Sequence, residues 1–302
     1  MLKKIPIPLT GVMLAMATLG NLLAFYGPLY KIICGILALP LGMLLVAKVI
    51  FYPRVVKQEL ENPILLSVAG TFSMGLMVLS TYRVFFGAIA YSVWLIGFVL
   101  HLSLIVYFTI KFMLPPDWNK VFASYYIVYV GIGVAGVTAG VHNNLFLGKI
   151  SFWFGFISLL FLFPFISYRY YKFPEVPEPA RALICIYAAP VSLCLAAYVQ
   201  ATPAPALLFL QLMLLWSTLV YVFVLRHIIL NLIRSFYPSW AAFTFPLVIC
   251  ALSTKLTLLA VAKRGFTWSY LERFILWPEI IIATLIVIYV YARFALQLGR
   301  KK

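Results

Sequence analysis

The chain alternates long apolar runs with short polar links along its whole length. Ten of the runs are long enough to cross about 30 Å of hydrocarbon as helices. They cover residues 8–27, 30–51, 63–82, 87–112, 122–141, 146–168, 179–199, 204–226, 239–262 and 274–296. No polar stretch between them is long enough for a soluble domain. The pattern therefore predicts an all-α polytopic membrane protein with ten transmembrane helices.

The starts of the runs are evenly spaced. The odd-numbered runs begin near residues 8, 63, 122, 179 and 240, at intervals of 55, 59, 57 and 61 residues. A fixed period of this length is typical of a structural unit repeated in tandem. We therefore predict one transmembrane channel domain over residues 1–302, built from five tandem helical hairpins.

Small residues separate two kinds of run. In 20-residue windows, the odd-numbered runs contain seven to nine Gly, Ala, Ser or Thr residues, and the even-numbered runs contain three to five. Small side chains let helix backbones approach closely, and they also leave space along a shared axis. One interpretation is an inner ring of five odd-numbered helices around a central pore, with the bulkier even-numbered helices facing lipid. The alternative is that the small residues only tighten helix pairs and enclose no pore.

Composition and charge narrow the class of protein. Of the 302 residues, 65% are hydrophobic and 10% are charged, whereas soluble domains carry about 25% charged residues. The net charge of +16 comes from short clusters between apolar runs rather than from one basic stripe, so nucleic-acid binding is not expected. Sixteen of the 23 Lys and Arg residues lie on the side of the termini. This bias predicts a cytoplasmic-membrane protein with both termini in the cytoplasm.

The odd-numbered runs lack the groups that catalysis requires. They carry no acidic residue, the three histidines lie on separate segments, and the four cysteines form no close-set pair. A hydrolase or transferase needs a positioned nucleophile, base or metal cluster. We expect no enzyme activity, no catalytic residue, no metal and no cofactor. His101 and Glu279 are the candidates for a proton relay at membrane depth, and both lie on even-numbered runs, which argues against strong proton coupling.

Prolines and glycines interrupt the odd-numbered runs. Pro246 removes the amide that would bond to the fourth preceding carbonyl, and Pro190 does the same in the seventh run. Gly70 and Gly136 are among the glycines that loosen the third and fifth runs. Freed carbonyls are tolerated at membrane depth where they face a cavity, so these residues predict kinked inner helices around a lumen. Phe245, directly before Pro246, is either a plug in that lumen or a packing side chain.

Lys255 is the basic residue in the middle of an odd-numbered run. It follows Phe245 by ten residues, which is roughly 15 Å along a helix. One interpretation makes Lys255, Thr244 and Thr254 pore-lining groups, with the lysine attracting anions. The alternative is a lysine that extends outward to the membrane interface. A pore of small groups with one lysine and no acid favours anions over cations.

Four segments carry a resemblance to a known family. They are "IPLTGVMLAMATLGN" (7–21), "NPILLSVAGTFSMGLMVLSTY" (62–82), "PEPARALICIYAAPVSLCLAAY" (177–198) and "PSWAAFTFPL" (238–247). The chain resembles the tellurite-resistance/dicarboxylate transporter family, which includes TehA-like bacterial proteins and the slow anion channels of plant guard cells. The resemblance covers essentially the whole chain in order and spacing.

The resemblance implies a fold and a gate. It implies five helical hairpins around a quasi-fivefold axis, with a pore in each subunit and usually a homotrimer. The family's aromatic–Ser/Thr–Phe stretch matches Phe243, Thr244 and Phe245, which assigns the gate to Phe245. Pro246 beside the gate is similar to the plant channels.

Together these observations predict an anion channel of the cytoplasmic membrane, with passive flow through a pore that Phe245 occludes. The alternative is a carrier or exporter of organic anions such as C4-dicarboxylates, or of tellurite or sulfite. The expected partners are small inorganic or organic anions, membrane lipid and two further copies of the chain.

Overall fold

The computed structural model describes residues 2–299, and every regular element in this range is a helix. Within these residues, seven helices are long and apolar enough to cross a membrane. An eighth span results if α3 (Pro53–Glu59) and α4 (Pro63–Leu79), between which the chain bends by 117°, are counted together. The predicted all-α polytopic class is confirmed. The predicted number of ten spans is not, because α1 (Leu9–Leu23) is short and residues 122–141 are broken into several pieces.

Five inner segments form a closed ring. In order of contact they are α1, α4, the broken pair α7 (Tyr125–Tyr129) and α8 (Gly133–Thr138), α10 (Ala188–Ala201) and α12 (Thr244–Ala262), and α12 contacts α1 again. Each inner segment is covered by the long helix that follows it in the chain. These outer helices are α2 (Pro28–Phe51), α6 (Ala90–Phe112), α9 (Leu145–Lys172), α11 (Leu207–Leu232) and α14 (Trp277–Gly299).

Burial separates the two sets of helices. The apolar windows of the inner spans Glu178–Ala201 and Pro238–Ala262 are 83% and 72% buried, whereas those of the five outer helices are 33–39% buried. Large apolar side chains such as Leu219 and Ile281 are exposed on the outer helices. Exposed apolar surface on this scale suits a hydrocarbon solvent.

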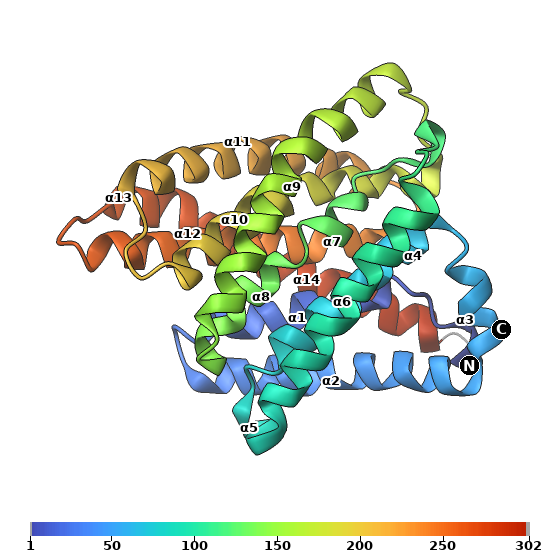
Figure 1. The fold of residues 1–302 in the computed structure, drawn as a ribbon, viewed down its shortest axis with the longest axis horizontal. Coiled ribbons are helices and arrows are strands. Elements are labelled where there is room, and N and C mark those ends of the chain that lie inside the picture. Colours follow the sequence, from blue (N-terminus) through green and yellow to red (C-terminus); the bar gives the residue numbers. More distant parts are fainter. Residues whose placement is uncertain (1, 300–302) are drawn as a thin grey trace.

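Short elements connect the long helices. They are η1 (Leu2–Lys4), α5 (Arg83–Phe86), η2 (Gly87–Ile89), η3 (Trp118–Lys120), η4 (Ala139–His142), η5 (Glu178–Tyr187), η6 (Pro238–Phe243), α13 (Ser269–Leu271) and the π-helix η7 (Glu272–Leu276). The start of α1 and the end of α14 lie at the same end of the bundle as α3, and α13 lies at the other end (Figure 1).

Most inner segments begin with tight turns. The 3-10 helices η5 and η6 lead into α10 and α12, and α1 and α7 begin with amides that bond to the third preceding carbonyl. Pro190 and Pro246 are each the third residue of the α-helix that follows a 3-10 segment. A proline has no amide for an α-helical bond, so both prolines lie where the helical winding changes. The segment α4 begins differently, with the Asn62 side chain accepting from the amides of Ile64 and Leu65.

Gly70 and Gly136 allow close packing of helices. A methyl group at Gly136 would lie 2.9 Å from Ala197 Cβ and 3.1 Å from the Gly148 carbonyl oxygen. At Gly70 it would lie 2.7 Å from Leu104 Cδ2 on the outer helix α6. Both glycines therefore lie at contacts between elements.

Candidate functional site

A cavity of about 560 Å³ lies within the inner ring, at the end where the inner segments begin. Its walls come from all five inner segments, together with the end of α3 and the turn η3. The lining residues fall within 6–11, 59–74, 119–131, 177–193 and 237–246. The cavity is therefore a property of the ring, because no helical hairpin encloses it alone.

The cavity extends only part of the way along the axis of the ring. Its deepest lining residues on the five segments are Gly11, Met74, Gly131, Leu193 and Pro246. Within the described residues, the parts of the inner segments beyond these five residues contribute nothing to its walls. Both the cavity and the 3-10 turns with which inner segments begin therefore belong to the half of the ring that carries α3.

Phe245 and Pro246 lie at this deep end. Phe245 is 6% exposed and lines the cavity, and its aromatic neighbour Phe243 is fully buried and does not line it. The Phe243 ring instead packs 5.4 Å from that of Trp240. Two phenylalanines separated by one residue thus face different surroundings. They form a matched pair for experiments.

The wall of the cavity is largely apolar and rich in proline. Seven prolines line it: Pro6, Pro8, Pro177, Pro179, Pro190, Pro238 and Pro246. Thr71 also lines it, but its hydroxyl lies 2.7 Å from the Val68 carbonyl oxygen and 2.6 Å from Thr10 Oγ1. An ion that enters such a space exchanges hydration for few polar partners, which is costly.

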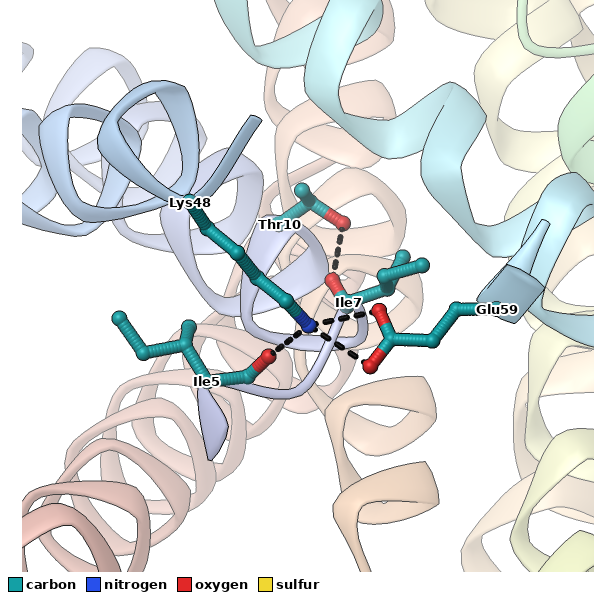
Figure 2. A network of polar contacts seen from close by, with 5 residues as sticks. All are labelled: Ile5, Ile7, Thr10, Lys48 and Glu59. Carbon is teal, nitrogen blue, oxygen red and sulfur yellow. Dashed lines mark hydrogen bonds and ion pairs between the residues drawn. The ribbon is translucent and has the colours of Figure 1, made fainter. Parts of the chain in front are cut away.

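Charge is sparse around the cavity. Among the described lining residues, Glu59 is the charged one. Lys48 is 1% exposed, and its ammonium lies 2.6 Å from Glu59 Oε2 (Figure 2). At the same end, Lys120 hydrogen-bonds Asp117 and holds the pKa of that carboxyl below its usual range. Glu59 and Asp117 are therefore each paired with a lysine.

A buried arginine supports the wall from behind. The Arg169 guanidinium lies 4.4 Å from the centre of the Phe122 ring, and Phe122 lines the cavity. The Arg169 side chain donates to the backbone carbonyls of Trp118, Phe173 and Glu175. It is 1% exposed, and its contacts tie the end of α9 to the link before α7.

The other predicted pore residues lie elsewhere. Lys255 Nζ is 3.5 Å from Glu272 Oε1 and 5.3 Å from the Tyr26 ring centre, so it faces the end of the bundle opposite to the cavity. Thr244 donates to the Ala241 carbonyl, and the Thr254 hydroxyl has no protein partner within the described chain. None of the three lines the cavity, so their predicted pore roles stay predictions. Pro190 and Pro246 do line it, whereas Gly70 and Gly136 do not.

His101 and Glu279 are two buried titratable residues on outer helices, and they differ in their hydrogen bonding. His101 lies 2.7 Å from Ser73 Oγ and 3.1 Å from the Val128 carbonyl oxygen, which joins α6 to α4 and α7. The Glu279 carboxyl is 1% exposed, and neither of its oxygens has a hydrogen-bond partner in the described chain. Sequence reasoning singled out both residues, and neither lines the cavity.

Comparison with known proteins gives one match and one negative result. The family model SLAC1, described as voltage-dependent anion channel, matches residues 4–295. No curated protein matches the chain. The matched range contains all five inner segments and every residue that lines the cavity.

Proposed function

The chain belongs to the SLAC1 family of voltage-dependent anion channels, and from this membership we propose that it is an anion channel in which Phe245 closes the pore. Family membership itself supports anion transport across a membrane. The gate, the passive mode of flow and the choice of anion are the proposed parts. The observation that carries the proposal is a ring-lined cavity that ends at Phe245 and Pro246.

The proposed gate works by desolvation. The apolar wall offers an anion few groups to replace its water shell, and an aromatic ring at the deep end narrows the path further. A hydrophobic constriction of this kind excludes both water and ions. Displacement of one ring opens the path, and the 3-10 segments beside Pro190 and Pro246 provide hinges because short 3-10 stretches within helices often mark such positions. Thr244, Thr254 and Lys255 belong, in this proposal, to the gate region and the route beyond it.

The test compares Phe245→Ala with Phe243→Ala in planar bilayers containing chloride, nitrate or malate. We expect Phe245→Ala to fold normally and to raise anion conductance at least tenfold, and Phe243→Ala to leave it near the parent value. In a packed core, Phe→Ala costs about 3–5 kcal/mol, so a destabilised and electrically silent Phe245→Ala protein would contradict the gate. Slow flux that saturates with substrate would favour a carrier of organic anions such as C4-dicarboxylates, or of tellurite or sulfite.

We also propose an orientation of the protein in the membrane and an oligomeric state. The excess of Lys and Arg at the end that carries the termini motivates placing the cavity mouth in the cytoplasm of the cell. Cysteines introduced at Lys57 and Lys172, after removal of the native cysteines, should resist an impermeant thiol reagent in intact cells; ready labelling from outside would reverse the orientation. The apolar outer helices provide surface for lipid and for a homotrimer, which the mass of the solubilised complex tests.

A further inference from the structure

A buried lysine and a cavity-lining glutamate meet at the mouth of the cavity. Lys48, in the last turn of α2, contacts both Glu59 oxygens, at 2.7 and 2.6 Å, and lies 2.6 Å from the Ile5 carbonyl oxygen (Figure 2). Glu59 is the last residue of α3, and Ile5 lies in the segment before α1. The ammonium therefore joins the segment before α1 to the ends of α2 and α3.

The two partners occupy different positions relative to the cavity. The Glu59 side chain is 28% exposed and lines the cavity, whereas the Lys48 side chain is 1% exposed and lies behind it. An ion at the mouth thus meets a carboxylate first and the ammonium second. Without its partner, the carboxylate would repel anions at the point where they enter the ring.

We propose that Lys48 and Glu59 form a charge-selectivity element of the mouth, in which Lys48 neutralises Glu59 and thereby keeps the cavity passable to anions. The inference rests on the proposed function, because it assumes that anions use this cavity. Glu59 is the specificity-determining residue, and Lys48 positions and neutralises it. Loss of Lys48 leaves a net negative mouth, and loss of Glu59 leaves a net positive one.

The opposite signs of these two changes define the experiment. Anion-to-cation permeability ratios are measured from reversal potentials in a gradient of sodium chloride, using the Phe245→Ala protein as parent so that currents are large. We expect Glu59→Gln to raise the ratio and Lys48→Gln to lower it, each roughly tenfold. The double variant should return near the parent ratio, because both charges are gone.

Glu61→Gln is the matched control. Glu61 pairs with Lys111 at 2.6 Å, is 58% exposed and does not line the cavity, so its loss should leave the ratio unchanged. Removing one partner of a buried pair destabilises proteins, and thermal unfolding in detergent is therefore measured for each variant. If Lys48→Gln does not fold, the permeability ratios of Glu59→Gln and Glu61→Gln still test the inference.

Two results would overturn the inference. One is a permeability ratio that stays at the parent value in folded Glu59→Gln and Lys48→Gln proteins. The other is a shift of the same sign in both, with lowered stability, which assigns the pair to structure alone. An absence of anion current in the Phe245→Ala parent would instead overturn the proposed function, and the inference with it.

Discussion

In the half of the inner ring where its segments begin, 3-10 turns and seven prolines surround a cavity of about 560 Å³. In the other half, the same segments continue as helices whose glycines and alanines touch, as Gly136 does with Ala197 across α8 and α10. Small residues are abundant in both halves. Their effect therefore depends on the backbone that carries them, because regular helices close the space that tight turns and prolines leave open.

The first way to test this comparison is a single methyl group placed in each half. A Cβ at Gly136 would lie 2.9 Å from Ala197 Cβ and 3.1 Å from a backbone carbonyl oxygen, neither of which can swing away. At the cavity-lining Gly11, the nearest atom is Ala241 Cβ at an ordinary 3.4 Å. Overpacking typically costs about 1–3 kcal/mol, so Gly136→Ala should lower the melting temperature by several degrees.

Gly11→Ala is the control, and it should keep or slightly raise the melting temperature, because alanine favours a helix over glycine by about 0.5–1 kcal/mol. Melting is measured as the loss of monodisperse protein when the detergent-solubilised sample is heated. Equal stability of the two variants would remove the proposed distinction between a packed half and a hollow half.

The sequence predicted the layers of the fold better than the number of spans. Apolar runs and the count of small residues identified inner and outer segments, because burial leaves a local signature. The number of ten spans is not confirmed, since α1 has 15 residues and residues 122–141 break around Gly131. Such breaks depend on packing against neighbouring helices, which no single run records.

For the cavity, the prolines were the residues whose involvement the sequence indicated. Pro190 and Pro246 each lack an amide hydrogen, and both line the cavity. The Lys48–Glu59 pair was missed because it forms only when the ends of α2 and α3 meet. Lys48 alone reads as one more basic residue near a membrane boundary, and its partner lies 11 residues further along the chain, beyond the helix break at Tyr52.

The second test concerns Lys255, the basic residue of the packed half. Its ammonium lies 3.5 Å from Glu272 Oε1 and is 14% exposed at the side chain, and the rings of Phe25 and Tyr26 lie within 6.0 Å. Paired with an acid, it contributes little net charge to a path through the ring. We therefore expect Lys255→Gln to lower the anion conductance of the Phe245→Ala protein by about twofold at most, since the charge of Lys255 is offset by that of Glu272 and is further reduced by salt screening.

Lys263→Gln provides the matched control, because Lys263 caps the same helix α12 and is exposed. Single-channel conductance is compared at 20 mM and 500 mM salt, chosen because screening lengths differ roughly threefold to sixfold over this range. If Lys255 attracts anions, Lys255→Gln should lower the conductance at low salt and have no effect at high salt. Lys263→Gln should have a smaller effect on the conductance at both salt concentrations. A tenfold drop for Lys255→Gln that persists at high salt would place this lysine in the narrow part of the path. The functional division between the two halves of the ring would then be wrong, because the half without a cavity would hold the group that limits conduction.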